Sequence, residues 1–343
     1  MLTIIHRRHG APEDVLELAE VAEPGPPGPD EVLIRVTRAS IHPGDLHGVE
    51  GSPAFGSPPH IAEAGRTPGF DGVGVIEAIG SNVDPAMDLS THRRVAYFPI
   101  ANGWSERVVA PASAVMVLPE NLSNEVAAQA LINTVTAEII IRAGHNAWAE
   151  DRRGAVTVIQ SGAASAVGRI ITTLLAERGA SVIRLVRSRS SARALEQDAY
   201  EGRVISTEDA GCPRALREAA AGQEIHVALD GVGGAVLPGL AEVLSPGSTI
   251  ISYGSLGGAS TDIRLLVPRG LTIRGVSINQ WFHLPAEVRQ TDIQTALRLA
   301  DARPELFPVE SMYPPDQIKQ AVRHVSRPGR TGAVLLAFQG VAP

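Results

Sequence analysis

One segment of the chain, residues 158–193, constrains the fold more strongly than any other. It reads VIQSGAASAVGRIITTLLAERGASVIRLVRSRSSAR: an apolar strand, a turn of small residues, an amphipathic helix, a second strand and a cluster of arginines. Two apolar strands joined through a helix form a βαβ unit, whose strands lie parallel in one sheet. The segment therefore predicts an α/β domain.

The same alternation of strands and helices continues to residue 278. Repeated βαβ units of this kind predict one parallel sheet with helices on its faces. The expected strands are 155–160, 181–186, 203–207, 225–230, 248–254 and 271–278; the expected helices follow Ala166, run from Pro213 to Ala221 and lie near Val236–Leu244.

The N-terminal part of the chain, up to about residue 125, has a different pattern. Short alternating runs such as 31–40 and 72–81 stand between Pro and Gly clusters, which is typical of an all-β or barrel-like domain. Apolar residues at helical spacing begin after Leu122 and end at Gly144, so the second domain starts there. After about Asn279 a helix and the strand 332–338 follow, and we expect this strand to return to the first domain.

Composition narrows the classes of partner. The 37 acidic and 30 basic residues give a net charge of −7, which disfavours a nucleic-acid partner. One cysteine, Cys212, excludes an internal disulfide and a multi-cysteine zinc site and fits a reducing compartment. The apolar stretches read as strand-length, with no signal-peptide pattern, so we expect a cytoplasmic protein with a small-molecule substrate and no membrane partner.

The turn after the first strand has the residue sizes that a dinucleotide requires. Backbone amides there must approach a pyrophosphate at a helix N-terminus, and only small side chains permit this approach. The pattern is not a full G-x-G-x-x-G, because Ser165 stands at the middle glycine position, and a small-residue turn that binds nothing would look similar. The small residues are Gly162, Ala163, Ala164, Ser165, Ala166 and Gly168.

The end of the second strand indicates which nucleotide fits. An acidic residue there would bind a ribose 2′-hydroxyl, whereas arginine binds a 2′-phosphate. The chain offers Arg187, Arg189 and Arg193, with no acid before Glu196. The prediction is NADPH, and the alternative is a solvated basic loop.

Taken together, these segments resemble the zinc-independent medium-chain dehydrogenase/reductases, and among them the mitochondrial-type trans-2-enoyl thioester reductases and the quinone oxidoreductases. The resemblance implies a Rossmann doubly wound parallel sheet at 126–278, and a GroES-like β-rich catalytic domain formed by 1–125 and 279–343. It also implies a homodimer paired through 271–278. The segments that carry it are 7–18, 39–51, 68–83, 133–137, 160–168, 185–189, 230–234, 251–255 and 271–281.

The resemblance also implies individual site residues. Asn133 and Thr136 would lie beside the nicotinamide, and Trp281 would line the substrate cleft. The residue types alone are also compatible with other roles. Asn133 and Thr136 could cap a helix or hydrogen-bond to its backbone, and Trp281 could be a core residue. The implied cofactor-binding residues are Ser161, Gly162, Ala163, Ser165, Ala166, Val167, Gly168, Arg187, Arg189, Tyr253 and Ser255.

Zinc is not expected. Zinc-dependent relatives carry a cysteine where His42 stands, before Asp45, and a His-Glu pair where Phe70 and Asp71 stand. Without the cysteine and the His-Glu pair, the usual three-ligand catalytic site cannot form. Conjugate reduction is then more plausible than carbonyl reduction.

The proton donor is the main departure from the enoyl thioester reductases. Their tyrosine would follow LHGVEG at 46–51, but no tyrosine precedes Tyr97. Tyr97, His47 or His60 could substitute, as could water or the cofactor ribose. The segment 52–67 reads as a lengthened loop, which suggests a changed substrate.

These inferences favour an NADPH-dependent reductase of an activated C=C bond, with a 2-enoyl thioester or an enone as substrate. The alternatives are an NADPH quinone oxidoreductase, which needs no dedicated proton donor from the protein, and a non-catalytic NADPH-binding structural or regulatory protein.

Overall fold

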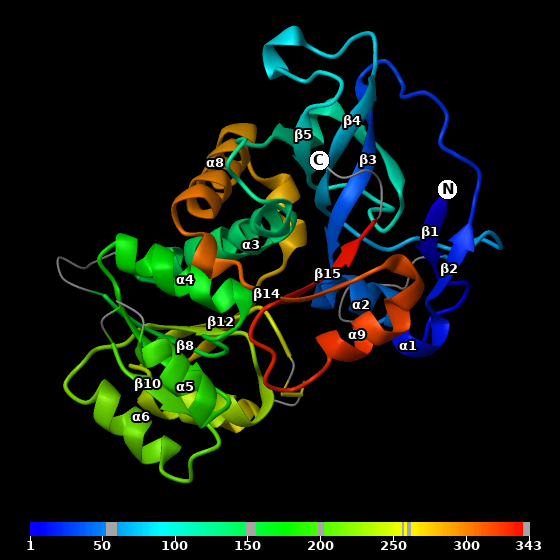
Figure 1. The fold of residues 1–343 in the computed structure, drawn as a ribbon. Coiled ribbons are helices and arrows are strands. Elements are labelled where there is room, and N and C mark those ends of the chain that lie inside the picture. Colours follow the sequence, from blue (N-terminus) through cyan, green and yellow to red (C-terminus); the bar gives the residue numbers. More distant parts are fainter. Residues whose placement is uncertain are drawn as a thin grey trace. The chain divides into compact units, whose positions relative to one another are not determined.

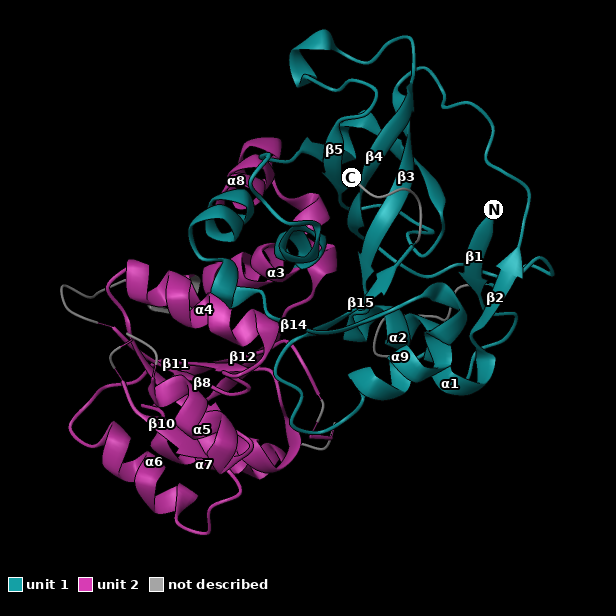
Figure 2. Ribbon diagram, in the orientation of Figure 1, with its two compact units in different colours: residues 1–132, 296–343 teal, residues 133–295 magenta. Residues whose placement is uncertain are grey.

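A computed structural model describes residues 1–52, 60–148, 156–197, 200, 202–255, 257–258 and 262–338. The chain forms two compact units (Figure 2): unit 1 comprises 1–132 and 296–343, and unit 2 comprises 133–295. The expected boundaries were 125/126 and 278/279. The observed divisions fall inside two helices, α3 (Asn124–Trp148) and α8 (Ala286–Ala302).

Unit 2 is built on a six-stranded parallel sheet (Figure 1). Its order, β10-β9-β8-β11-β12-β13, has the 3-2-1-4-5-6 arrangement of a doubly wound dinucleotide fold. The predicted α/β fold with a Rossmann sheet is confirmed. The strands are β8 (Thr157–Gln160), β9 (Ser181–Val186), β10 (Val204–Ser206), β11 (Val227–Asp230), β12 (Thr249–Ser252) and β13 (Thr272–Gly275).

The helices of unit 2 lie close to their expected positions, and the arginine cluster adds one that was not expected, α5. A core of apolar side chains, among them Ile159, Ile183 and Leu240, holds the sheet and helices together. The α-helices that lie wholly within unit 2 are α4 (Ala166–Glu177), α5 (Arg189–Glu196), α6 (Cys212–Ala220) and α7 (Leu237–Val243).

Unit 1 contains a seven-stranded sheet, in which β6 pairs with β3 beside the main path β14-β15-β3-β4-β5-β7, and the small antiparallel pair β1-β2. Strand β15 pairs antiparallel with β3, which confirms that the C-terminal strand returns to the first domain. The strands are β1 (Leu2–Ile5), β2 (Glu17–Glu20), β3 (Glu31–Ser40), β4 (Gly72–Ile79), β5 (Arg94–Tyr97), β6 (Arg107–Pro111), β7 (Val115–Val117), β14 (Val309–Tyr313) and β15 (Ala333–Ala337); the helices are α1 (Pro12–Val15), α2 (Pro43–Glu50) and α9 (Ile318–Val325).

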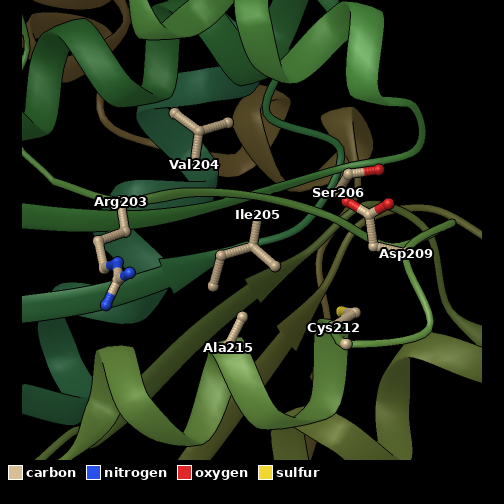
Figure 3. A pocket seen from close by; sticks show the side chains of 8 residues that line it. Arg203, Val204, Ile205, Ser206, Asp209, Cys212 and Ala215 are labelled. Carbon is tan, nitrogen blue, oxygen red and sulfur yellow. The ribbon is translucent and has the colours of Figure 1, made fainter.

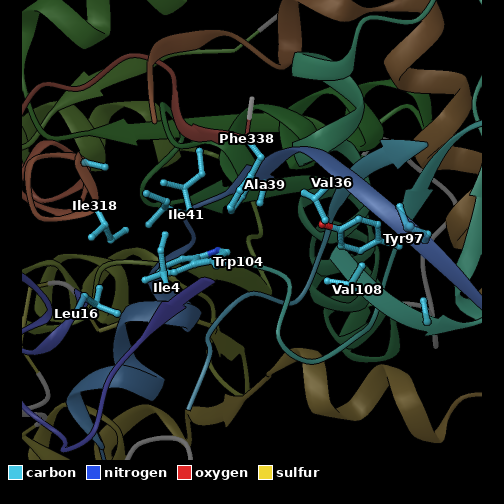
Figure 4. Close-up of a cluster of buried hydrophobic side chains, with 14 of the residues drawn as sticks. Ile4, Leu16, Val36, Ala39, Ile41, Tyr97, Trp104, Val108, Ile318 and Phe338 are labelled. Carbon is cyan, nitrogen blue, oxygen red and sulfur yellow. The ribbon is translucent and has the colours of Figure 1, made fainter. Parts of the chain in front are cut away.

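Trp104 lies at the centre of the unit 1 core (Figure 4). Its indole Nε1 donates to the Ser40 carbonyl at 3.0 Å, and its backbone N–H donates to Pro68 at 3.0 Å. Gly69 has a φ of +100°, and a Cβ there would lie 2.5 Å from the indole Cδ1. The tryptophan therefore fixes the loop that leads into β4.

Helix α3 corresponds to the apolar segment at helical spacing that was expected from Leu122 to Gly144. The most apolar 18-residue stretch of its segment 124–145 has a mean hydropathy of 1.3, enough by length and composition for a membrane span, yet 83% of that stretch is buried in the structure. Apolar core helices of globular proteins pass the same test, so burial against the protein accounts for its composition.

A chain of three polar side chains fastens the C-terminal part of unit 1. The Tyr313 hydroxyl lies 2.9 Å from His324 Nδ1, and His324 Nε2 lies 2.9 Å from Glu310 Oε1. The other carboxylate oxygen of Glu310 accepts from the backbone N–H groups of Thr331 and Gly332. These backbone N–H groups and His324 lower the pKa of Glu310 from 4.5 to about 2, against the opposing effect of burial.

Replacing Glu310 with glutamine should lower the free energy of unfolding at pH 7 by about 1–2 kcal/mol, because charge-assisted hydrogen bonds are lost. A depressed pKa stabilises the fold above the unfolded pKa, so the difference from wild type should narrow as the pH falls from 4.5 towards about 2. Urea unfolding at several pH values measures it. The exposed Glu63→Gln serves as control; a constant E310Q deficit down to pH 3 would contradict this assignment.

Candidate functional site

The turn between β8 and α4 is shaped by two glycines. Gly162 adopts a φ of +64°, which glycine tolerates without strain. At Gly168 a Cβ would lie 2.9 Å from the Ala163 carbonyl carbon and closer still to the Gly162 carbonyl oxygen. The Ser165 hydroxyl caps α4 by accepting from the Gly168 N–H at 3.0 Å. Helix and strand thus meet closely, with the helix N-terminus presented at the strand end.

A buried glutamine, which the sequence analysis did not single out, fastens this turn. Gln160 Nε2 donates to the Gly168 carbonyl at 2.8 Å, and its Oε1 accepts from the Thr172 hydroxyl at 3.0 Å. Both side chains are buried. The glutamine links the last residue of β8 to the first turns of α4, so the turn geometry is held from beneath.

Asp230, at the carboxyl end of β11, organises the neighbouring strand ends. Its buried carboxylate accepts from the Ser161 hydroxyl, from the Val232 N–H at 3.1 Å and from the Gly233 N–H at 3.0 Å. The Gly231 N–H donates to Ser161 Oγ at 3.0 Å. Because β8 and β11 are neighbours where the strand order reverses, these groups lie at the edge where doubly wound sheets bind dinucleotides.

Tyr253 follows β12, the next strand of the sheet. Its hydroxyl donates to the Ser161 carbonyl at 3.3 Å, and its ring would obstruct any side chain at position 231. Burial, with the nearby Asp230 charge, raises the pKa of Tyr253, so the phenol stays protonated. Ser255 is exposed two residues later. The predicted cofactor-binding residues Ser161, after β8, and Tyr253, after β12, are therefore joined by a hydrogen bond, and Asp230, which was not predicted, lies on the strand between them.

The arginine cluster at the end of β9 is only partly available to a ligand. Arg187 is exposed and has no ion pair with any residue that the structure describes, and the same holds for Arg193. Arg189 begins α5 and forms an ion pair with Asp209, while its backbone N–H donates to Glu208 at 2.7 Å. These two acids were not predicted from the sequence, because they follow β10 and reach the arginine cluster only through the pairing of β10 with β9.

A pocket of about 250 Å³ lies beside β10 and the start of α6 (Figure 3). Arg203, Ser206, Asp209 and Cys212 are among its lining residues. Burial and the Asp209 charge raise the pKa of the Cys212 thiol, so this cysteine is less reactive than a free thiol.

The remaining predicted catalytic residues occupy varied positions. In unit 2, Asn133 is buried on α3, Thr136 is half-buried, and the Nε1 of the buried Trp281 donates to Asp292 at 3.0 Å. In unit 1, Tyr97 is fully buried, with its hydroxyl 3.4 Å from the Gly103 carbonyl. His47 is half-buried on α2, 3.0 Å from Glu50.

Unit 1 also contains a buried group of three side chains, His42, Asp45 and Asp71, hereafter the histidine–carboxylate cluster. His42 Nε2 lies 3.1 Å from Asp71 Oδ1, and Asp45 Oδ2 accepts from the His42 backbone N–H at 2.8 Å. The second oxygen of each carboxylate, Asp45 Oδ1 and Asp71 Oδ2, is buried without a hydrogen-bond partner among the described residues. Within the described part of the chain, no three His, Cys, Asp or Glu residues are arranged to hold a metal ion.

Comparisons with known proteins agree with this architecture. Residues 28–120 match the alcohol dehydrogenase GroES-like domain family, which confirms the predicted GroES-like part. A mitochondrial enoyl-acyl-carrier-protein reductase of Caenorhabditis elegans is 28% identical over 81% of this chain and 78% of its own length. One of Xenopus tropicalis is 24% identical over 94% and 89%. Escherichia coli quinone oxidoreductase, solved with NADPH, superposes with a TM-score of 0.82 at 21% identity, covering 98% and 100%.

Replacing Gly168 with alanine should destabilise the chain by about 2 kcal/mol, because its methyl group meets backbone atoms that cannot move aside. Gly239→Ala in α7 is the matched control, since its Cβ would meet only Leu216 at 3.6 Å. Urea unfolding of both variants measures the difference. Equal stability of the two variants would show that the close approach at Gly168 is not a constraint.

Proposed function

Because the chain is a medium-chain dehydrogenase/reductase of the enoyl reductase and quinone oxidoreductase type, we propose that it is an NADPH-dependent reductase of an activated C=C bond. The substrate is a 2-enoyl thioester or an enone. One observation carries the proposal: a glycine-shaped turn and an exposed arginine, at the ends of β8 and β9, lie on a sheet of 3-2-1-4-5-6 order.

The residues of unit 2 fit NADPH. The backbone of Gly162 and Ala163 fills the space that a Cβ of Gly168 would need, so the N-terminus of α4 is held close to the turn that would receive the pyrophosphate. The free guanidinium of Arg187 suits the 2′-phosphate, supported by Arg193 and by the hydroxyls of Ser188 and Ser191, which lie 3.0 Å apart. The ion pair of Arg189 with Asp209 leaves Arg187 as the main phosphate ligand.

Bound NADPH supplies a hydride to the β-carbon of the acceptor. The protein must hold the dinucleotide still while this happens. Asp230 does so by fixing the Ser161 hydroxyl and the turn at Val232 and Gly233 in one hydrogen-bonded arrangement. The neutral Tyr253 hydroxyl adds a further bond to the carbonyl of Ser161.

Quinone reduction is the second candidate. It uses the same hydride, and both oxygens of the hydroquinone product exchange protons directly with water. The absence of a tyrosine after LHGVEG favours it, as does the full burial of Tyr97. A third candidate is an NADPH-binding protein without turnover.

We also propose a zinc-independent reaction, because His42 and Phe70 stand where zinc-dependent relatives carry ligands. A cytoplasmic location rests on the single cysteine. Both proposals are open to direct test, by metal analysis of the active protein and by cell fractionation.

The proposed reaction is tested by NADPH oxidation with crotonyl-CoA, a simple enone and a naphthoquinone, each with NADH as control. Reduction of the thioester or the enone supports the main proposal, and reduction of the quinone alone supports the second. Tight NADPH binding without oxidation by any of the three would contradict both enzymatic proposals.

Arg187→Ala should raise KM for NADPH by about 10- to 100-fold, because a charge-assisted bond to the 2′-phosphate is lost. KM for NADH should stay unchanged, since that cofactor has no phosphate there. Arg214→Ala on α6, an exposed arginine paired with Glu218, is the matched control. A parallel rise for both cofactors would contradict the assignment of Arg187.

A homodimer through β13 is a further part of the proposal. This strand is at the sheet edge and pairs with β12 alone among the described strands, and the nearby Ile263 and Val267 are 69% and 73% exposed. The N–H groups of Thr272 and Val276 donate towards β12, so that of Gly275 faces the open edge.

Sedimentation should therefore give twice the chain mass of 36.0 kDa. Gly275→Pro should shift the protein to monomers, because it removes an outward donor. Gly275→Ala should remain dimeric, since a Cβ there meets nothing within 4 Å. A wild-type monomer at micromolar concentration would overturn the dimer.

A further inference from the structure

Burying the histidine–carboxylate cluster costs free energy, and the packing of unit 1 does not require these polar side chains. Side-chain exposure is 11% for His42 and 3% for Asp71, and Asp45 is equally buried. Buried carboxylates cost several kcal/mol unless their oxygens are satisfied, and here one oxygen of each has no partner among the described residues. Groups held in this way concentrate at functional sites.

The fold holds the cluster rigidly. His42 precedes α2 as its N-cap residue, and the Asp45 side chain, one turn into that helix, closes back on the His42 backbone N–H. Asp71 follows Gly69, whose conformation Trp104 fixes. The imidazole is therefore oriented by groups that cannot shift independently.

The surface beside the cluster suits a flat conjugated ligand. Phe70, which immediately precedes Asp71, is 38% exposed although it is a large apolar side chain. A Cβ built on Gly44, two residues after His42, would lie 3.8 Å from the Phe70 ring, so this ring is close to the start of α2. The exposed ring offers a stacking surface close to the segment that carries His42, whose side chain is 11% exposed.

We propose that His42, positioned by Asp71 and Asp45, supplies the proton that completes reduction of the C=C bond. This inference rests on the proposed reductase function. It assigns to the histidine–carboxylate cluster the acid that the sequence leaves open.

The charges around His42 support its protonated form. Burial opposes the charge, but the Asp71 carboxylate outweighs it through its charge and hydrogen bond, and the net effect raises the pKa of His42. Asp45 on α2 adds to this, and Arg330, in the loop before β15, opposes it. Burial raises the pKa of Asp45 to about 7, against the charge of His42 and the hydrogen bond from the His42 backbone. Tyr97 on β5 lies near Asp71 but stays neutral, because burial raises its pKa.

The proton balance is complete. The β-carbon receives the hydride, the π electrons of the C=C bond move towards the carbonyl, and NADP⁺ remains. The α-carbon then takes a proton from the His42 imidazolium, so that one N–H bond breaks and one C–H bond forms. Water returns the proton to the neutral imidazole. Each turnover consumes one NADPH and one proton.

The test compares two kinds of acceptor in the full-length protein. His42→Asn keeps a residue that caps helices well but removes the titratable ring. It should lower kcat/KM for crotonyl-CoA or an enone by about 10²-fold. Reduction of a naphthoquinone should change by less than about threefold, because its product takes protons from water. His92→Asn, an exposed histidine with a φ of +69°, is the matched control.

The pH profile separates a proton donor from a structural residue. In wild type, alkene reduction should fall as the pH rises through the raised pKa of His42, and this fall should be absent in H42N. Asp71→Asn should move the fall to lower pH, because the charge that raises the pKa is gone. Thermal unfolding checks that each variant is folded.

Three results would overturn the inference. H42N could keep alkene reduction with the wild-type pH profile, or it could lose alkene and quinone reduction equally. Wild type could also reduce quinones alone, which would remove the need for a carbon-protonating acid while leaving hydride transfer intact. If the wild-type protein oxidises NADPH with none of the three acceptors, the proposed function itself is refuted.

Discussion

The close approach of α4 to β8 is the constraint on which the rest of unit 2 depends. Gly162 must adopt a positive φ and Gly168 must lack a side chain for the helix to start against the strand end. Gln160 and Ser165 then hold this geometry with hydrogen bonds from both sides. In a doubly wound parallel sheet, dinucleotides bind at the carboxyl ends of the strands where the strand order reverses. The turn between β8 and α4 lies at this position.

Much of the fold could be predicted because short sequence patterns, each within a few consecutive residues, determine its strands, helices and turns. Apolar runs separated by helical segments predict the strands of unit 2, and an apolar strand without a following helix predicts that β15 joins the other sheet. The small residues from Gly162 to Gly168 identify the turn, since steric limits act over a few positions. The helix α5 was missed because serines and arginines carry little apolar periodicity.

Other parts of the site depend on residues far apart in the sequence. Asp230 meets Ser161 only because β11 is placed next to β8 in the sheet, and Asp209 reaches Arg189 only through the pairing of β10 with β9. His42 and Asp71 belong to different segments of unit 1. No local pattern predicts the hydrogen bond between them, because the two residues are 29 positions apart in the sequence.

The central claim, hydride transfer from NADPH to carbon, is tested most directly with NADPH deuterated at C4 of the nicotinamide. The two C4 positions would be labelled separately, with crotonyl-CoA or an enone as acceptor, and the product analysed by mass spectrometry and NMR. The account predicts that one of the two labels appears quantitatively at the β-carbon, with a solvent-derived hydrogen at the α-carbon. A reduced product without deuterium at the β-carbon from either label, or no reduced product from either acceptor, would contradict it.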